Sequence, residues 1–241
     1  MLTPKDIAKM IDHSLLKPEL TVERVRAGCK VALKYDVASV CVRPADLEIA
    51  REELKGSDVK LSTVIGFPHG SNLTEVKVLE AEKALSQGAL ELDMVLNIGR
   101  LLSGETDYVK ADIKAVVDVA HKAGAIVKVI FENCYLTDEL KVKACQICEE
   151  VGADFVKTST GFGTGGATIE DLTLMRKTCG PSVRVKAAGG VRTLDSALAV
   201  RAVGVERIGA TATEVIVEEA IKREAEGTLK ESKDGELQSG Y

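Results

Sequence analysis

The sequence has few aromatic residues, no excess of positive charge and no long apolar run. Tryptophan is absent and aromatic side chains make up 3% of the residues, so the 45% that are hydrophobic must pack mainly as aliphatic side chains. Lysine and arginine number 32 against 37 aspartates and glutamates, which gives no general attraction to nucleic acid or to an anionic membrane. No stretch approaches the ~18 apolar residues of a membrane span, and no signal-peptide pattern opens the chain, so we expect a cytoplasmic protein.

Cysteines are scattered through the chain, which is long enough to fold without disulfides, so we expect reduced thiols. Cys145 and Cys148 have the spacing of a zinc or redox motif, but they lie in an apparent helix and no second pair completes four ligands. The histidines are too dispersed for a metal triad: His13, His69 and His121. We therefore expect no metal site.

Short apolar runs rich in β-branched residues alternate with longer amphipathic stretches, which is typical of strand–helix units around a parallel sheet. The predicted strands span residues 13–16, 37–42, 60–67, 89–96, 126–132, 153–160, 183–189 and 206–211. The predicted helices span residues 21–35, 45–54, 72–87, 105–123, 138–151, 169–178, 194–203 and 213–226. A glycine separates a helix from the next strand at four points, as a short turn requires: Gly88, Gly124, Gly152 and Gly204.

Eight such units in 241 residues, about 30 residues each, predict an α/β fold of the (β/α)₈ TIM-barrel type better than an open doubly wound sheet. Residues 1–241 are therefore interpreted as a single domain. We expect residues 1–12 to form an extra N-terminal helix, with Thr3 as N-cap and Pro4 at its first position, that caps the barrel. Residues 228–241 are polar and without periodicity, and are predicted to be a flexible tail.

Barrel enzymes place their functional groups where strands end, so charged residues within the predicted strands are the first candidates. These are Asp93, Lys128, Glu132, Lys157 and Lys186. Burying a lysine among β-branched side chains costs several kcal/mol unless it is paired or deprotonated, so packing alone does not explain these positions. For any single lysine, the alternative is an interior cation paired with a carboxylate, or an ammonium that reaches water.

Lys157 and Lys186 lie near the ends of consecutive predicted strands, and neighbouring strands are ~4.8 Å apart. Like charges this close cannot both ionise cheaply, so one ammonium lowers the pKa of the other. The neutral amine can then attack a carbonyl and form a Schiff base, which acts as an electron sink. The lysine pair thus predicts carbon–carbon bond chemistry without a metal.

Glycine-rich loops accompany the last three predicted strands: residues 161–166, Gly189–Gly190, and Gly209 before a threonine-rich helix start. Backbone N–H groups and a helix N-terminus in these loops form the usual phosphate site of a barrel. Any one of the loops could instead serve only as a tight turn. Because they are consecutive and lie beside both lysines, we expect them to bind a phosphate.

Five segments of the chain resemble deoxyribose-phosphate aldolases, in the family's order and over nearly the whole length. They are residues 11–16 (IDHSLL), 65–70 (IGFPHG), 91–99 (ELDMVLNIG), 155–162 (FVKTSTGF) and 186–192 (KAAGGVR). The resemblance implies a class I aldolase, a lyase of deoxyribonucleotide catabolism. It would interconvert 2-deoxy-D-ribose 5-phosphate with D-glyceraldehyde 3-phosphate and acetaldehyde, without a cofactor.

By position within the matching motifs, Lys157 would be the Schiff-base nucleophile and Lys186 the neighbouring cation that lowers its pKa. Asp93 would donate and accept protons, and Lys128 is expected near Asp93 as a charge partner. The ligands implied are small sugar phosphates and aldehydes, with no nucleic acid and no membrane. The expected protein partner is a further copy of the chain, in a homo-oligomer that is a dimer or tetramer.

The phosphate loops depart from the family's pattern at two points. Phe162 stands where some relatives carry a lysine, and Thr211-Ala212 replaces a serine-containing pair. Phosphate binding is therefore expected to depend more on Gly190, Arg192 and backbone N–H groups. The expected phosphate-binding residues are Gly161, Gly189, Gly190, Arg192, Gly209 and Thr211.

Tyr241, the last residue, suggests a tail that folds over the barrel mouth and carries a proton to the enamine carbon, with a disordered terminus as the alternative. Two other functions compete with the aldolase. Another phosphate-binding barrel enzyme, isomerase or transaldolase-like, would place its lysine elsewhere, and a non-catalytic sugar-phosphate sensor would lose the buried amine. The pairing of Lys157 with Lys186 argues against both.

Overall fold

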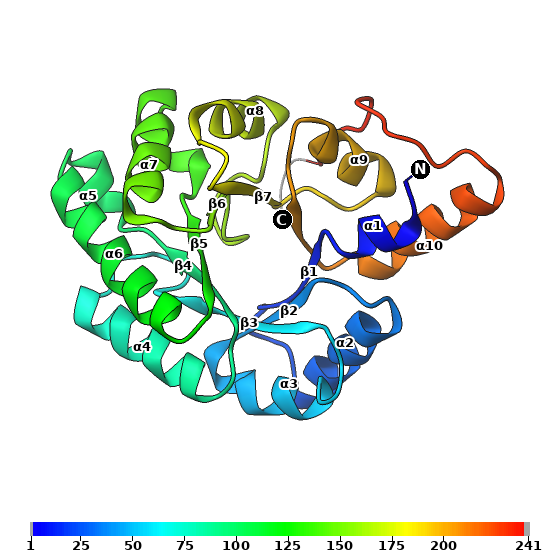
Figure 1. Ribbon diagram of the computed structural model, residues 1–241, viewed down its shortest axis with the longest axis horizontal. Helices are drawn as coiled ribbons and strands as arrows, with labels where there is room; N and C mark the ends of the chain where they lie inside the picture. Colours follow the sequence, from blue (N-terminus) through cyan, green and yellow to red (C-terminus); the bar gives the residue numbers. More distant parts are fainter. Residues whose placement is uncertain (1, 239–241) are drawn as a thin grey trace.

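The computed structural model describes residues 2–238 and contains a closed barrel of eight parallel strands (Figure 1). The strands follow one another around the barrel in chain order, and β8 pairs with β1 to close it. They are β1 (Ile11–Leu15), β2 (Ser39–Val42), β3 (Lys60–Ile65), β4 (Glu91–Val95), β5 (Ile126–Ile130), β6 (Phe155–Lys157), β7 (Arg184–Ala188) and β8 (Arg207–Ala210). The prediction of a (β/α)₈ barrel is confirmed.

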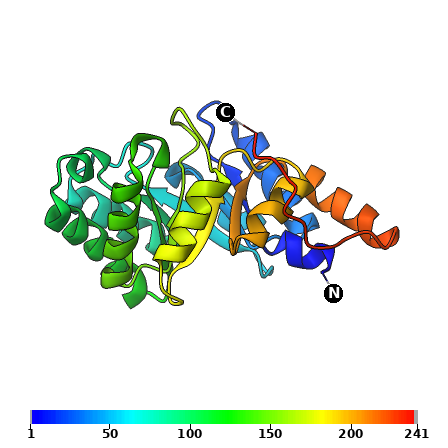
Figure 2. The same cartoon turned by 90° about the horizontal axis from the view of Figure 1, so that it is seen from above.

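Helices surround the barrel (Figures 1 and 2). They are α1 (Pro4–Ala8), α2 (Val22–Lys34), α3 (Leu47–Glu53), α4 (Thr74–Ser86), α5 (Ile98–Leu102), α6 (Thr106–Lys122), α7 (Asp138–Val151), α8 (Ile169–Thr178), α9 (Leu194–Ala202) and α10 (Thr213–Ala225), with the 3₁₀ turns η1 (Pro44–Asp46) and η2 (Asn133–Tyr135). No helix in the described part of the chain is long and apolar enough to cross a membrane.

Local sequence signals explain where these helices begin and end. Threonine side chains accept a hydrogen bond from the first turn of α2, α7, α8 and α9, at Thr21, Thr137, Thr168 and Thr193. At the other end, the four glycines expected between helix and strand all have φ between +75° and +96°, a conformation that other residues rarely adopt. These signals make the strand–helix repeat visible in the sequence.

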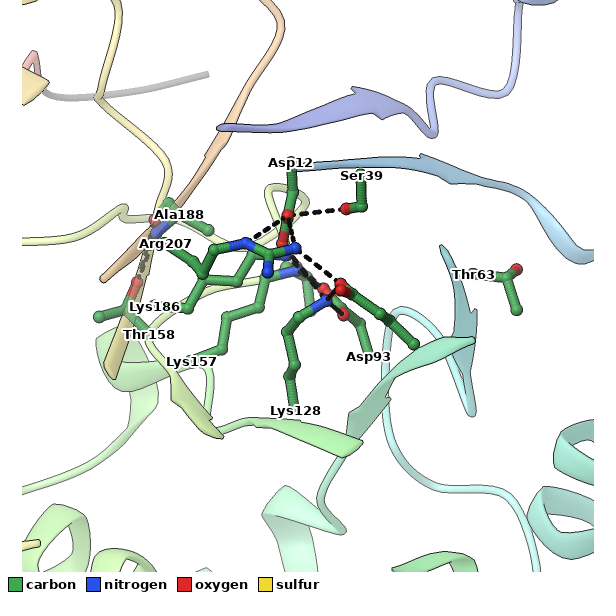
Figure 3. A network of polar contacts seen from close by, with 12 residues as sticks. Asp12, Ser39, Thr63, Asp93, Lys128, Lys157, Thr158, Lys186, Ala188 and Arg207 are labelled. Carbon is green, nitrogen blue, oxygen red and sulfur yellow. Dashed lines mark hydrogen bonds and ion pairs between the residues drawn. The ribbon is translucent and has the colours of Figure 1, made fainter. Parts of the chain in front are cut away.

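Side chains of each strand alternate between the helices and the barrel interior. Leu92, Met94 and Val129 belong to the main hydrophobic core between strands and helices. Asp93 and Lys128, which alternate with them, meet inside the barrel (Figure 3). Aliphatic packing therefore stabilises the outer layer, while the barrel interior contains charged groups.

The N-terminal prediction is wrong in its second half, because Ile11 and Asp12 belong to β1 and not to a helix spanning residues 1–12. Thr3 does cap α1 through a capping box, and Pro4 occupies its first position, but the helix ends at Ala8. Pairing of β1 with both β2 and β8 explains the change, since these backbone hydrogen bonds require an extended chain. The short helix packs against α10.

The boundaries of the other helices and strands differ less from the predicted ones. The predicted strand 153–160 forms regular pairing only over β6, and the remaining residues enter the loop that follows. The short helix α5 was not predicted. Of the predicted tail, residues 228–238 have no regular structure and pass over α9 (Figures 1 and 2), where Glu231 pairs with Arg201 at 2.8 Å. Gln238 then donates its backbone N–H to the Gly190 carbonyl at 3.1 Å, so this part of the tail lies on the barrel.

Candidate active site

Seven charged side chains meet inside the barrel, and six of the eight strands supply them (Figure 3). The register explains their proximity, because β4 and β5 align Asp93 with Lys128 and β6 and β7 align Lys157 with Lys186. Glu91 and Asp93 are successive inward-facing residues of β4, so the cluster extends over two levels of the barrel interior. The set is Asp12, Glu91, Asp93, Lys128, Lys157, Lys186 and Arg207.

Asp93 lies at the centre of this cluster and is fully buried. Its Oδ1 accepts a hydrogen bond from Lys128 Nζ at 2.9 Å. Its Oδ2 accepts from both Lys157 Nζ at 2.8 Å and Lys186 Nζ at 2.7 Å. Lys128 therefore lies beside Asp93 as expected, and the two lysines of the predicted pair share a single carboxylate oxygen.

Sequence alone did not single out Asp12, Glu91 and Arg207, which extend the cluster. Asp12 Oδ2 lies 2.5 Å from Lys186 Nζ, and Glu91 Oε2 accepts from Lys128 Nζ at 2.6 Å. Arg207 links the two carboxylates by donating to Asp12 Oδ1 and, at 2.7 Å, to Glu91 Oε2. One signal was available for Glu91, since a residue two positions before Asp93 on a strand faces the same side.

The surrounding charges and burial shift the pKa values of Lys157 and Asp93 by different causes. Burial lowers the pKa of Lys157 and the Lys186 cation lowers it further, although Asp93 opposes both effects. Burial raises the pKa of Asp93, but Lys128, Lys157 and Lys186 together hold it well below its usual range. The Lys157 amine therefore loses its proton more easily than a free lysine does, next to a carboxylate that stays ionised.

The charge balance of the cluster points the same way. Three carboxylates face four basic groups within it, so one positive charge is in excess when all are ionised. A net buried charge is costly, and loss of one proton removes the excess. Arg207 cannot supply this proton, and the carboxylates around Lys128 raise its pKa despite burial. The lowered pKa of Lys157 makes its amine a candidate for this proton loss.

A pocket of about 530 Å³ opens above Lys157 and Lys186, and Asp12 also lines it. Much of its wall comes from the loops after β6, β7 and β8, and the rest from β1, the loop after β1, and β2. All six residues expected to bind phosphate line this one pocket: Gly161, Gly189, Gly190, Arg192, Gly209 and Thr211. The geometry thus places a glycine-rich, N–H-bearing wall within the same space as the buried amine.

Local backbone geometry explains the glycines in that wall. Gly189 and Gly190 have φ of +81° and +93°, which a residue with a side chain adopts only under strain. Helix α10 begins directly after Thr211 and Ala212, and no side chain caps its first turn. His13 of β1 holds this helix start through a 2.8 Å contact between its Nδ1 and Thr213 Oγ1. A helix N-terminus at the pocket edge suits an anion.

Three apolar side chains also line the pocket: Leu16, Cys41 and Phe162. Burial raises the pKa of Cys41 to about 11, so its thiol stays protonated at neutral pH. Tyr241, the other residue expected at the mouth, lies outside the described residues. Among those that are described, no three histidine, cysteine, aspartate or glutamate side chains are grouped to hold a metal ion.

The fold and the site together define a class of protein. Its members are parallel barrel enzymes that hold a substrate at the carboxyl ends of the strands, beside buried charged side chains that include lysine amines.

Comparison with known proteins places the chain more closely: residues 6–212 match the model of the DeoC/LacD family aldolase, and the chain belongs to this family. It is 58% identical over 217 residues to the deoxyribose-phosphate aldolase of Thermococcus gammatolerans, an alignment that covers 89% of this chain and 96% of that protein.

Two solved structures are similar in fold and sequence. A putative deoxyribose-phosphate aldolase from Coccidioides immitis has a TM-score of 0.88 and 40% identity, over 91% of this chain and 87% of its own. The tetrameric deoxyribose phosphate aldolase from Aeropyrum pernix has a TM-score of 0.84 and 33% identity, over 90% and 92%. The chain is thus an aldolase, and hence a lyase, with a barrel fold.

Proposed function

We propose that this aldolase cleaves 2-deoxy-D-ribose 5-phosphate reversibly into D-glyceraldehyde 3-phosphate and acetaldehyde, as a step in the breakdown of deoxyribose phosphate. The observation that carries the proposal is the position of Lys157, a buried amine of lowered pKa at the base of a pocket walled by glycine loops. The names of the relatives at 58% and 53% identity support the choice of sugar phosphate.

In the proposed reaction, the neutral Lys157 amine attacks C1 of the open-chain sugar. The carbinolamine loses water and becomes a protonated imine. Lys186 and Lys128 keep Asp93 ionised while this cation forms, since both donate to the Asp93 carboxylate. Cleavage then needs only a base for the C3 hydroxyl proton.

Asp93 is proposed to accept that proton through a water molecule, while the Lys186 ammonium, which donates to the same carboxylate, takes part in the relay as a donor. The electrons of the O–H bond form the C3 carbonyl, the C2–C3 bond breaks, and its electrons pass to the imine to give an enamine. Protonation of the enamine carbon and hydrolysis of the new imine release acetaldehyde and restore the amine. Lys157 to Asp93 and Lys186 to Asp93 distances of 2.8 and 2.7 Å support a shared proton path.

The phosphate group is proposed to bind at the wall formed by Gly161, Gly189, Gly190, Gly209 and the start of α10. Arg192, which also lines the pocket, supplies a positive charge on this side. Two anchoring points, an imine at C1 and a phosphate at C5, would fix the scissile bond between them.

Reduction of the imine tests the proposal directly. Incubation with acetaldehyde and borohydride should leave an ethyl group on Lys157, located by peptide mass mapping, and 2-deoxy-D-ribose 5-phosphate with borohydride should give a stable adduct on the same lysine. Lys77, another fully buried lysine, is the internal control and should remain unmodified. An adduct on another lysine, or the absence of an adduct, would overturn the mechanism.

We also infer that the protein acts in the cytoplasm as a homo-oligomer. The six free cysteines agree with a reducing compartment, and the tetrameric Aeropyrum pernix relative supports self-association. Light scattering on the purified protein would give the number of copies.

A further inference from the structure

Glu132, directly after β5, is a buried carboxylate that the proposed mechanism does not use. Its backbone adopts the left-handed conformation with φ +56° and ψ +64°, which is uncommon for a residue with a side chain and costs free energy. No ion pair joins Glu132 to a cation among residues 2–238, and burial raises the pKa of its carboxyl group. A strained backbone and an unpaired buried acid at one position both require compensation.

The compensation comes from the loop after β6. Glu132 Oε1 accepts a hydrogen bond from the Thr160 backbone N–H at 3.1 Å, and Oε2 accepts from the Thr160 hydroxyl. The same hydroxyl oxygen accepts from the Phe162 N–H at 2.9 Å. A continuous series of hydrogen bonds therefore runs from Glu132 through Thr160 to the backbone of Phe162.

The loop also packs tightly against this carboxylate. A Cβ atom at Gly163 would lie only 2.9 Å from Glu132 Cδ, so the chain can approach this closely only with glycine there. The far end of the loop is fixed separately, because Ala167 donates its N–H to the carbonyls of Ala188 and Gly189. Glu132 is thus the anchor for the near end of the loop.

The position of Phe162 follows from this anchor. Phe162 lines the pocket, and its ring meets the ring of Phe67 edge-on, with 5.3 Å between centroids and an interplanar angle of 86°. Phe67 belongs to the loop after β3 and does not line the pocket itself, so its ring supports the Phe162 ring in the pocket wall. This contact lasts only while the loop after β6 keeps its present path.

We propose that Glu132 is a positioning residue that fixes the loop of residues 160–163, so that Phe162 packs on Phe67 and forms part of the pocket wall around the acceptor aldehyde. The proposal rests on the proposed aldolase function. It assigns Glu132 no contact with the substrate, and it predicts a larger effect on acceptor binding, which depends on the position of Phe162, than on imine formation at Lys157.

A double-mutant cycle on Glu132 and Phe162 tests the proposal in the synthetic direction. Glu132→Ala and Phe162→Ala should each raise the KM for D-glyceraldehyde 3-phosphate roughly tenfold, while kcat changes about threefold or less. The double variant should be no worse than Phe162→Ala alone, because both changes act through one ring. Glu132→Gln keeps an oxygen for the Thr160 N–H and should lie between Glu132→Ala and the unchanged protein.

The absence of tryptophan from the chain permits a second readout that does not depend on activity. The substitution Phe162→Trp would introduce a single indole fluorophore, and its emission would report the position of the loop. Adding Glu132→Ala or Thr160→Val to this variant should shift the emission to longer wavelength and increase quenching by acrylamide. Glu150→Gln, at an exposed ion pair on α7, is the matched control and should change neither quantity.

The outcomes separate this proposal from the proposed function. Additive effects of Glu132→Ala and Phe162→Ala on KM, or an indole emission that neither loop substitution changes, would overturn the role of Glu132 while acetaldehyde still modifies Lys157. Failure of acetaldehyde to modify Lys157 in the unchanged protein would instead overturn the proposed function. Thr160→Val keeps the test decisive where Glu132→Ala does not fold.

Discussion

Two buried lysines in this molecule have similar surroundings but different prospects for chemistry. Lys157 lies inside the barrel, 2.8 Å from Asp93, and Lys77 lies between α4 and α6, 2.6 Å from Asp112. Burial lowers the pKa of both amines, and in each case the neighbouring carboxylate opposes it. Depth of burial and the presence of a partner therefore do not distinguish them.

The two lysines differ in how many cations share the neighbouring carboxylate and in whether the amine lines a pocket. Asp93 serves three lysines at once, whereas Asp112 serves Lys77 and also accepts from Thr74 at 2.8 Å. Lys77 Nζ also donates a hydrogen bond to the Val95 carbonyl at 3.0 Å, whereas Lys157 lines the pocket. A buried lysine becomes a candidate nucleophile when its carboxylate is divided among several cations and a substrate can reach it.

The largest expected effect concerns Lys157. Replacing it by methionine should lower kcat/KM by at least about 10⁴-fold, because the substitution removes the amine that is proposed to form the imine. Its unfolding free energy should change little, since Asp93 keeps two cation partners. Steady-state kinetics with 2-deoxy-D-ribose 5-phosphate give kcat/KM, and urea unfolding gives the unfolding free energy. A kcat/KM above about one hundredth of the original would count against Lys157 as the nucleophile.

Lys77→Met should show the reverse pattern. The substitution leaves Asp112 as an uncompensated buried charge, which costs about 3–5 kcal/mol of unfolding free energy. The kcat of the folded fraction should be unchanged, because Lys77 does not line the pocket. Urea unfolding and kinetics below the unfolding transition check both parts.

A double variant provides the control for this pair. Lys77→Met combined with Asp112→Leu removes both charges and should recover much of the lost stability. Should the double variant be no more stable than Lys77→Met alone, the cost would be one of packing and not of an unpaired charge. A loss of kcat in either variant would remove the distinction between the two lysines.

The sequence predicted one of these lysines and not the other, for a physical reason. A lysine such as Lys157 interrupts the nearly continuous apolar run of a parallel strand that is buried on both faces, so it is visible in the sequence. Lys77 lies on an amphipathic helix, where lysines normally face solvent, so nothing local marks it as buried. Its burial depends on how α4 and α6 pack across the chain, which periodicity does not encode.

The same reasoning applies to the rest of the fold and site. The strand–helix order and the helix ends were predictable, because apolar period, threonine caps and glycines act locally. Asp12 was missed as a member of the charge cluster because β1 is short and its partner Lys186 lies far along the chain. Glu132 was noted as a strand-end charge, but its link to Thr160 depends on a left-handed turn after β5.

The smallest expected effect is a shift in the pH dependence of imine trapping at Lys157. This measurement distinguishes whether the neighbouring charges or burial alone make Lys157 reactive. Only the neutral amine forms an imine, so the rate of trapping by acetaldehyde and borohydride should rise with pH through the pKa of Lys157. Burial is the main cause that lowers this pKa, and the Lys186 cation lowers it further.

Lys186→Leu removes a nearby positive charge, so the pKa of Lys157 should rise and the midpoint of the trapping rate should move to higher pH by about one unit. Lys77→Met should leave the midpoint where it is. A midpoint that does not move in Lys186→Leu would mean that burial sets the reactivity of Lys157, and the comparison with Lys77 would then depend on pocket access alone.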